Sequence, residues 1–364
     1  MNRIIISVSN DLTTDQRVIK TCDCFNELGY DILLIGRKMK HSLPLARPYK
    51  TFRFRLLFNK GFFFYAEYNL RLFFKLFFLK KDLLLANDLD TLLPNYLISK
   101  MFSKKLIYDT HEYYTEVPEL IGRPKVKSFW LSIEKKIFPR LKNVLTVNHK
   151  LADIYSQKYL VPVTVVKNVP FKRNSTTFIS NKFEKTDKTI ILYQGAVNKG
   201  RGLELMIDTM SNLNNYQLVI IGDGDVSKQL KKQATVLGLG TKVIFLGKIS
   251  PKDLPAYTES ADVGISLEEN LGLSYRYSLP NKIFDYIQAE IPVLASDLPL
   301  INQLMQEFKI GEILRKRNPE NLAFLIEKIC ANKESYRESL QKAAILFNWD
   351  VEKKVLIAFI ENIE

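Results

Sequence analysis

Short apolar runs alternate with amphipathic stretches along nearly the whole 364-residue chain. In the first half, β-rich runs stand at residues 3–9, 31–36, 81–88, 104–112 and 143–148. In the second half they stand at residues 189–195, 216–224, 242–248, 261–267 and 291–297. Helical patterns separate them, so we predict right-handed βαβ crossovers and parallel sheets. Ligands of such sheets bind beyond the carboxyl ends of the strands.

A polar segment separates the two halves. Residues 171–188 read FKRNSTTFISNKFEKTDK, rich in Ser, Thr and Asn and without a clean period, which indicates a linker. We therefore predict an α/β protein with two Rossmann-like domains that enclose a cleft. The predicted boundaries are an N-terminal domain over 1–172, a linker over 173–188, a second domain over 189–345, and a C-terminal segment over 346–364. That last segment is predicted to form a helix from about Val351 to Ile363 that packs on the first domain.

The composition fits two buried cores, with 46% hydrophobic and 25% charged residues. The opening MNRIIISVSN indicates a strand and not a signal peptide, because its apolar run is too short. No uncharged apolar stretch of about 18 residues predicts a spanning helix. The chain has three cysteines, which is an odd number, and two of them, Cys22 and Cys24, fall in a predicted helix; the third is Cys330. We therefore expect neither a disulfide framework nor a zinc site, and a cytoplasmic location.

The net charge of +14 lies mostly in the first half. Residues 1–150 hold 26 Lys and Arg against 14 Asp and Glu, whereas the rest holds 27 against 25. Between Asp31 and Glu67 there are eight bases and no acid. This half is suited to an anionic lipid surface, a phosphorylated acceptor or nucleic acid, unless it is merely a solvated basic surface.

A glycine-rich loop with two bases stands between a strand and a helix, in YQGAVNKGRGLELMI at 193–207. Glycines permit close backbone approach, and the N–H groups at a helix start favour an anion. The loop matches neither a Walker A motif nor G-x-G-x-x-G. It predicts a diphosphate cradle, with an ordinary tight βα turn as the alternative. Its candidate residues are Gly195, Lys199, Gly200, Arg201 and Gly202.

Two later segments add candidates for the same site. The strand in FLGKIS ends at Gly247, followed by Lys248. In SLPNKIFDYIQAEIPVLAS, Lys282 precedes a helix and Asp285 shares its helix face. A base there suits phosphate and an acid suits ribose hydroxyls. The alternative for Asp285 is a first-turn acid that the helix dipole favours.

In the first half, His111 follows the strand LIYDT at the carboxyl edge of the predicted sheet, with Asp109 and Glu112 beside it. A histidine there can donate a hydrogen bond to a sugar hydroxyl, unless it is a satisfied loop residue. Asp15 and Arg17 lie at the equivalent edge, before the first long helix. They either meet donor or acceptor or cap that helix. A Ser-His-Asp hydrolase is excluded for want of a G-x-S-x-G elbow.

The order of these segments resembles retaining glycosyltransferases of family 4, which have the GT-B fold. The resemblance runs through YQGAVNKGRGLE, LVIIGDGD, VIFLGKIS, ADVGISL, LPNKIFDYIQAEIPVLAS and IGEIL. The first half resembles a bacterial branch in NDLTTDQRVIK, LLLANDLDTLLP, YDTHEYYTEVPEL and LTVN. The resemblance implies two Rossmann-like domains facing each other across a cleft and a nucleotide-sugar donor bound mainly by the second. It also implies retention of configuration and no metal or cofactor.

The resemblance also implies roles for individual residues. Arg201, with Lys199, matches the bases that hold the donor diphosphate, and Asp285 matches the second acid of an E-x7-E pattern that contacts ribose. Gly247 and Lys248 would lie near the base, and His111 would contact the donor sugar as the candidate catalytic residue. The donor-sugar and acceptor side would include Asp15, Arg17, Asp109, Glu112, Ser278 and Leu279.

The chain departs from that family pattern at two positions. Tyr277 stands where the first acid of E-x7-E belongs, and neither Glu268 nor Glu269 restores the spacing. Ala196 stands where many members carry a phosphate-binding base, for which Lys199 or Lys282 could compensate.

An aromatic segment remains unassigned. Residues 61–81, GFFFYAEYNLRLFFKLFFLKK, hold nine aromatic residues, and Glu67, Arg71 and Lys75 share one helix face. This predicts either a buried helix with one wet stripe or a helix lying on a membrane.

The sequence thus predicts a glycosyltransferase that moves a sugar to a glycan or lipid-linked acceptor in surface polysaccharide synthesis. We expect it in the cytoplasm, peripheral on the inner face of the cytoplasmic membrane. One alternative is a GT-B sugar-nucleotide epimerase, which needs acids and histidines around the sugar. Another is a non-catalytic nucleic-acid-binding protein, but no signature of one appears, so nucleic acid is not an expected partner.

Overall fold

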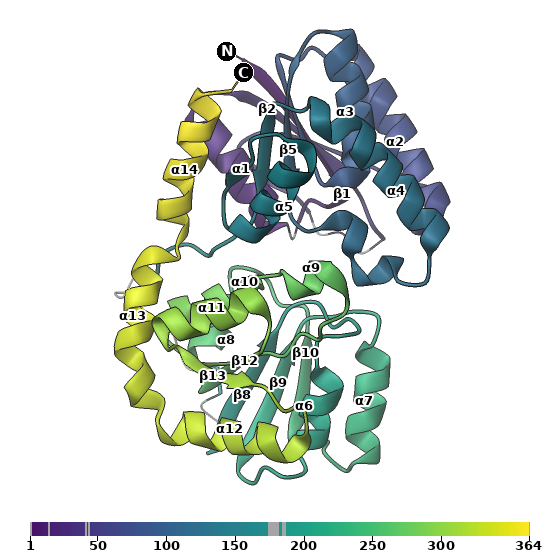
Figure 1. The fold of residues 1–364 in the computed structure, drawn as a ribbon. Helices are drawn as coiled ribbons and strands as arrows, with labels where there is room; N and C mark the ends of the chain where they lie inside the picture. Colours follow the sequence, from purple (N-terminus) through teal and green to yellow (C-terminus); the bar gives the residue numbers. More distant parts are fainter. Residues whose placement is uncertain are drawn as a thin grey trace. The chain divides into compact units, whose positions relative to one another are not determined.

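The computed structural model describes residues 2–13, 15–40, 42, 44–173, 182–183 and 187–363. The chain divides into two compact units, Met1–Asn168 with Lys353–Glu364, and Val169–Glu352. Most of the predicted linker over 173–188 lies outside the described residues. Each unit is built around a parallel sheet with helices on both faces (Figure 1).

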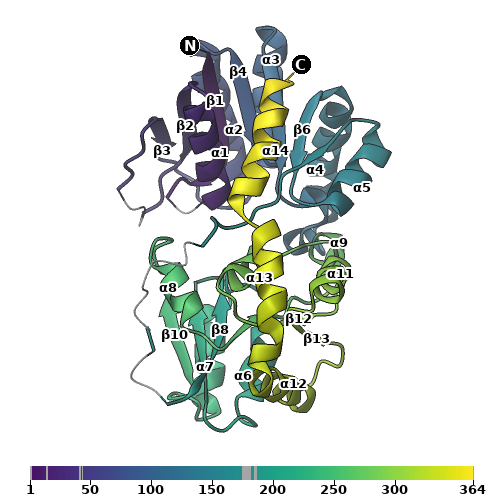
Figure 2. The ribbon, with the colours of Figure 1, turned by 90° about the vertical axis from the view of Figure 1, so that its left-hand side faces the viewer.

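The sheet of the first unit has the strand order β3-β2-β1-β4-β5-β6-β7. Its strands are β1 (Arg3–Asp11), β2 (Asp31–Arg37), β3 (Lys50–Phe54), β4 (Leu83–Asn87), β5 (Lys105–Thr110), β6 (Asn143–Thr146) and β7 (Thr164–Val165). Its helices are α1 (Gln16–Glu27), α2 (Gly61–Phe78), α3 (Leu89–Met101), α4 (Pro124–Ile137) and α5 (His149–Tyr159). Helix α1 lies on one face of the sheet, and α2, α3 and α4 lie on the other (Figures 1 and 2).

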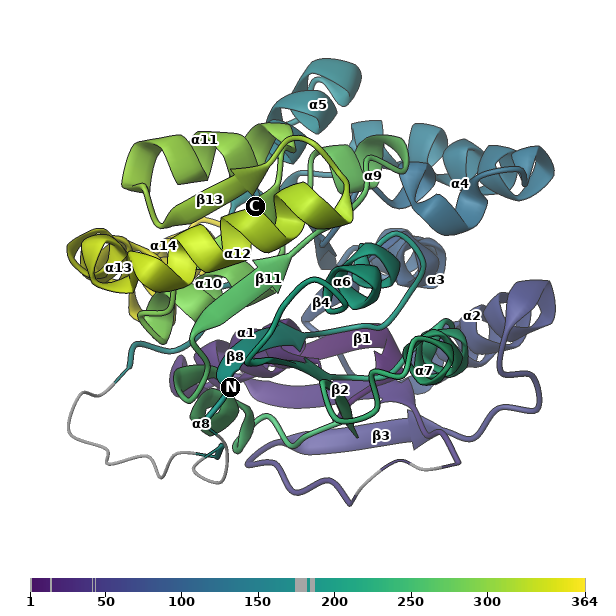
Figure 3. The same cartoon turned by 90° about the horizontal axis from the view of Figure 1, so that it is seen from below.

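The sheet of the second unit has the order β10-β9-β8-β11-β12-β13. Its strands are β8 (Thr189–Gln194), β9 (Tyr216–Ile221), β10 (Val243–Gly247), β11 (Val263–Ser266), β12 (Val293–Ser296) and β13 (Gly311–Leu314). Its helices are α6 (Leu203–Thr209), α7 (Ser227–Val236), α8 (Leu254–Glu259), α9 (Gly272–Arg276), α10 (Asn281–Gln288), α11 (Pro299–Phe308), α12 (Pro319–Ala331) and α13 (Arg337–Leu346). Helices α6 and α12 pack side by side (Figure 3).

Both faces of the second sheet are buried. Ile191 and Tyr193 of β8 belong to one core with α6, α7 and α12, whereas Ile190 and Leu192 belong to the other core with α10 and α11. Successive side chains of a strand point to opposite faces. A strand buried on both faces therefore reads as a continuous apolar run, which is why these strands were predictable.

The last helix, α14 (Trp349–Glu361), begins in the second unit and continues into the first. From Lys353 on, its residues belong to the first unit, where Leu356 and Ile360 are buried. Lys353 forms an ion pair with Glu27 at the end of α1, and Figure 2 shows α14 beside α1.

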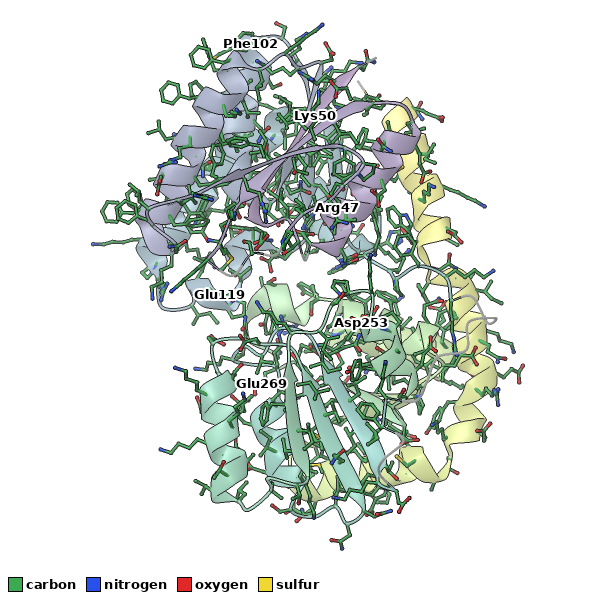
Figure 4. The ribbon with its side chains drawn as sticks, turned by 180° about the vertical axis from the view of Figure 1, so that it is seen from behind. Arg47, Lys50, Phe102, Glu119, Asp253 and Glu269 are labelled. Carbon is green, nitrogen blue, oxygen red and sulfur yellow. The ribbon has the colours of Figure 1, made fainter. Side chains whose placement is uncertain are left out.

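Part of the basic segment between Asp31 and Glu67 forms a strand of the first sheet. Its residues 50–54 form β3, which the sequence analysis did not predict, and Phe54 is buried in the first core. Arg53 of this strand lies 3.8 Å from Asp11 at the end of β1. Arg47 and Lys50 lie on the loop before β3 and at its start (Figure 4).

Helix α2 is buried along one stripe only, and the alternative in which it lies on a membrane stays a prediction. Phe64, Tyr68, Leu72 and Leu76 are buried in the first core, so the helix is part of the fold. Other aromatic residues of α2 are exposed, so residues 62–79 are not buried as a whole. Among the described residues, no helix combines the length and the apolar character needed to cross a membrane.

Candidate active site

A buried carboxylate in the second unit binds two cations. Glu268 follows β11 and is fully buried, and its Oε1 accepts a hydrogen bond from Lys282 Nζ at 2.5 Å. Arg201 Nη1 lies 3.4 Å from the same oxygen, and Ser266 Oγ donates to Oε2 at 2.7 Å. Burial would raise the pKa of Glu268, but Lys282 and Arg201 outweigh it and lower the pKa to about 2. Glu268 is therefore an anion at neutral pH.

The glycine-rich loop packs directly against this cluster. A Cβ on Gly195 would lie 3.5 Å from Lys282 Cε, and one on Gly202 would lie 2.2 Å from the backbone oxygen of Leu267. Gly202 also has a φ of 71°, which favours glycine. These glycines let the loop approach β11 closely, so Arg201 reaches Glu268.

The two cations are further held by aromatic rings. Lys282 Nζ lies 4.7 Å from the ring centre of Tyr193, and Arg201 Cζ lies 4.7 Å from that of Tyr275. Burial lowers the pKa of Lys282, although Glu268 opposes that shift. Lys199 is exposed on the same loop. The structure thus brings Arg201 and Lys282 together, with Lys199 nearby in sequence.

Asp285 lies beside this cluster on α10. Its Oδ2 accepts a hydrogen bond from Gln194 Nε2 at 2.8 Å. Thr258 Oγ1 in turn donates to Gln194 Oε1 at 2.7 Å, which fixes the orientation of that amide. Asp285 is half-buried. Its carboxylate therefore lies close to the loop after β8.

The remaining candidates of the second unit lie on neighbouring turns. The backbone oxygen of Gly247 accepts from Gly222 N–H at 2.8 Å, so the turns after β9 and β10 are adjacent. Lys248 is exposed next to Gly247. Ser278 Oγ donates to the backbone oxygen of Tyr275 at 2.8 Å, and Leu279 is half-buried after it. These positions surround the ends of the strands.

In the first unit, Arg17 and Asp109 bind each other. Arg17 Nε lies 2.9 Å from Asp109 Oδ2, Nη2 lies 2.6 Å from Oδ1, and Nη1 donates to the backbone oxygen of Val166 at 2.6 Å. Burial would raise the pKa of Asp109, but Arg17 and His111 hold that pKa well below its usual range. Asp15 accepts from Val18 N–H at 3.2 Å and caps α1. The capping alternative therefore describes Asp15.

His111 lies between two carboxylates. Its Nδ1 is 3.3 Å from Asp88 Oδ2 and its Nε2 is 3.3 Å from Asp109 Oδ2. Burial lowers the pKa of His111, but Asp88 and Asp109 together raise it to about 9, so the ring is an imidazolium at neutral pH. Among the described residues, its Nε2 has no partner with hydrogen-bond geometry. Glu112, the next residue, has an exposed side chain.

Two acids that follow β4, Asp88 before α3 and Asp90 in its first turn, were not among the predicted site residues. Asp88 has a φ of 58°, which is strained for a residue with a Cβ, and it accepts the backbone N–H of His111 at 2.9 Å. Asp90 is buried, and burial with the Asp88 charge raises its pKa to about 7. Ser9 Oγ donates to Asp90 Oδ2 at 2.5 Å. The signal in the sequence that could have identified them is their place directly after a buried strand.

Glu268 was also missed as a site residue. It was set aside because its spacing does not fit the E-x7-E pattern, yet it is the acid that the structure places beside Arg201. Tyr277, at the expected position, lies half-buried after α9. Figure 4 labels Glu269, the neighbour of Glu268, at the end of the second sheet. Within the described part of the chain, no group of His, Cys, Asp and Glu is arranged to hold a metal ion.

Residues 175–346 match the family model described as glycosyl transferases group 1. An uncharacterized glycosyltransferase of Methanocaldococcus jannaschii is 26% identical over 151 residues, which are 40% of this chain and 37% of that protein. Alpha-monoglucosyldiacylglycerol synthase of Streptococcus pneumoniae is 32% identical over 108 residues, which are 29% of this chain and 23% of that protein. The matched segments thus span less than half the length of these curated relatives.

Solved structures resemble the whole chain. Sucrose-phosphate synthase from Thermosynechococcus elongatus superposes with a TM-score of 0.81 at 16% identity, over 99% of this chain and 98% of that one. An Anabaena protein in complex with UDP-glucose superposes with a TM-score of 0.74 at 14% identity, over 99% and 100%. Residues 175–346 are thus similar to glycosyl transferases group 1, and the whole chain shares the two-domain fold of these solved structures. The predicted fold class is confirmed, whereas family 4 remains a prediction.

Proposed function

We propose that the protein transfers a sugar from a nucleotide sugar to a glycan or lipid-linked acceptor, with retention of anomeric configuration and without a metal or cofactor. The observation that carries this proposal is the meeting of Arg201 and Lys282 at Glu268, where two cations face one carboxylate. These three groups together carry a net positive charge at the carboxyl ends of parallel strands, where ligands bind. A donor diphosphate would neutralise that excess.

The donor would be held by the second unit. Arg201 and Lys282 would bind the diphosphate and stabilise the charge that develops on it as the glycosidic bond breaks, with Lys199 adding charge. Asp285 would accept from ribose hydroxyls, and Gly247 and Lys248 would lie near the base. The Anabaena structures, which contain UDP and UDP-glucose, support a nucleotide-sugar donor.

The first unit would supply His111 to the donor sugar. An imidazolium N–H can donate to a sugar hydroxyl or a phosphate oxygen. Asp109 and Arg17 would then be positioning residues that hold the charged ring. We further propose a role in surface polysaccharide synthesis at the inner face of the cytoplasmic membrane. The similarity to a synthase of glucosyldiacylglycerol supports an acceptor carried by lipid.

The acids around His111 also fit the alternative function, a sugar-nucleotide epimerase. Asp88, Asp90 and Asp109 all lie close to its ring or its backbone, and an epimerase needs such groups around the sugar. A single experiment separates the two functions. The protein is incubated with a panel of UDP- and GDP-sugars, with and without membrane-extracted acceptor, and the products are followed by NMR.

We expect nucleoside diphosphate release that depends on acceptor, a glycoside that retains the donor configuration, and no effect of EDTA. An epimerised sugar nucleotide formed without acceptor would establish the alternative. Activity that disappears with EDTA and returns with manganese would contradict the metal-independent mechanism.

A further inference from the structure

Helix α2 has two apolar stripes on opposite sides. The inner stripe, Phe64 to Leu76 at four-residue spacing, lies in the core of the first unit. The outer stripe is Phe62, Leu70, Phe74 and Phe78, which are all exposed, Phe78 by 80%. Each outer residue stands two positions from an inner one, or about 200° around the helix. A helix that only covers a core needs one apolar stripe, so the outer stripe is more apolar surface than the packing of the core requires.

The outer stripe belongs to a larger apolar surface. Phe77 of α2 contacts Phe102 after α3, with ring centres 5.4 Å apart, and α2 and α3 pack side by side (Figure 1). Figure 4 labels Phe102 at one end of this surface. We call it the outer aromatic face. Its exposed residues are Leu57, Phe58, Phe62, Phe63, Leu70, Phe74, Phe77, Phe78, Leu97, Met101 and Phe102.

The acids near the outer aromatic face are already bound. Glu67 accepts backbone N–H groups of Leu57 and Phe58 and lies 2.7 Å from Arg71. Asp82 accepts from Arg3 N–H at 2.9 Å and lies 3.7 Å from Lys104. The other acids between residues 57 and 105, all of which the structure describes, are Asp88 and Asp90 beside His111. Within residues 57–105, Glu67 on α2 and Asp82 after it are therefore paired with backbone N–H groups and bases.

Bases surround the same face. Lys60 precedes α2, Lys80 follows it, and Lys100 lies at the end of α3, all with exposed side chains. Arg55 is exposed on the loop before α2. A broad apolar surface rich in aromatic rings, with bases at its rim, complements the headgroup boundary of an anionic bilayer.

We propose that the outer aromatic face docks the first unit on an anionic lipid bilayer. The outer stripe inserts its rings at the headgroup boundary, while the inner stripe keeps α2 in its own core, so the helix lies along the surface. This inference rests on the proposed function for its purpose, since docking would bring the enzyme to a lipid-linked acceptor. Its physical basis in α2 and α3 is independent of the donor site.

Vesicle sedimentation tests the proposal. The probes are vesicles of phosphatidylcholine alone and of equal parts phosphatidylcholine and phosphatidylglycerol. The variant is Phe62→Ser/Phe74→Ser/Phe78→Ser, and the control is Val236→Ser/Phe324→Ser/Ile345→Ser, which changes three exposed apolar residues of the second unit. We expect wild type and control to bind the anionic vesicles, less at high salt, and the variant to bind at least about tenfold more weakly.

Equal vesicle binding by the variant and wild type would overturn the proposal. Wild-type protein that does not bind anionic vesicles would overturn it too. A wild-type dimer that the variant abolishes, without vesicle binding, would assign the face to a second copy instead. Calorimetry with UDP and GDP separates this inference from the proposed function. A variant that loses vesicle binding but retains nucleotide affinity supports docking, whereas wild-type protein without nucleotide affinity contradicts only the donor site.

Discussion

Lys282 donates a 2.5 Å hydrogen bond to Glu268, and both side chains are almost completely buried. A buried ion pair loses so much hydration that it often contributes little to stability. Here Arg201 adds a second cation at the same carboxylate oxygen. The three groups carry a net positive charge. That charge favours the binding of an anion, whereas it adds little to the stability of the protein without a ligand.

Glu268→Gln leaves Lys282 buried without its counter-charge, which should lower the free energy of unfolding by about 3–5 kcal/mol. A nucleoside diphosphate would then replace the lost negative charge. Thermal denaturation should show a lower Tm without ligand and a larger UDP- or GDP-induced rise in Tm than in wild type. Equal ligand-induced rises in both proteins would argue that Glu268 and the ligand do not share these cations.

Asp285→Asn should weaken binding of the whole nucleotide and hardly change binding of pyrophosphate. The reason is that Asp285 accepts a hydrogen bond from the Gln194 amide and lies close to the Arg201 and Lys282 cluster. A carboxylate there is suited to accept hydrogen bonds from ribose hydroxyls and not to bind phosphate. Titration calorimetry with UDP, GDP and pyrophosphate measures both effects. A loss of the same size for nucleotide and pyrophosphate would show that Asp285 acts through the cations instead.

His111 should stabilise the fold in a pH-dependent way. Its pKa is raised from 6.5 to about 9 in the folded state. A raised folded pKa gives a stabilisation that is complete below pH 6.5 and is lost as the pH rises through about 9. Urea denaturation should therefore show a difference between wild type and His111→Gln that shrinks over this window. A difference that is constant from pH 6 to pH 10 would refute the charged ring.

Helix α2 offers a matched pair of leucines. Leu72 is fully buried on the inner stripe and Leu70 is 59% exposed on the outer stripe. Leu72→Ala should lower the free energy of unfolding by about 2–5 kcal/mol, whereas Leu70→Ala should change it by less than about 0.5 kcal/mol. Denaturant titration of the two variants measures this contrast. Similar losses would mean that the outer stripe also packs within the fold.

Strands buried on both faces were predictable from the sequence. The runs that became β1, β2, β4 to β6, β8, β9, β11 and β12 are continuous and apolar, because parallel strands inside a sheet bury both faces. Strand β10 also has an apolar run, although it lies at the edge of its sheet and is only partly buried. Strand β3, KTFRF, was missed because it lies in a basic segment at the edge of the sheet. Its sequence alternates bases with aromatic residues and contains no continuous apolar run, so its composition is like that of a solvated loop.

The candidate site was predictable in part. Arg201 and Lys282 stood out because bases next to a glycine-rich loop or a helix start suit phosphate. Glu268 did not, because its place depends on β11 pairing with β8, where Val263 lies opposite Ile191. That pairing brings distant loops together, and spacing along the chain does not encode it. Asp88 was missed for a similar reason, since its strained backbone is a property of the folded turn.

The most direct test of the donor site is titration calorimetry of Arg201→Ala with UDP and GDP. A charge-assisted hydrogen bond to phosphate contributes about 1.5–3 kcal/mol, so the affinity for the nucleotide that wild type binds should fall roughly 10- to 100-fold. Arg315→Ala is the control, because Arg315 is exposed in the same unit and lies 3.7 Å from Asp297; it should bind like wild type. If Arg201→Ala binds both nucleotides as tightly as wild type, the donor diphosphate is not held at the Arg201, Lys282 and Glu268 cluster.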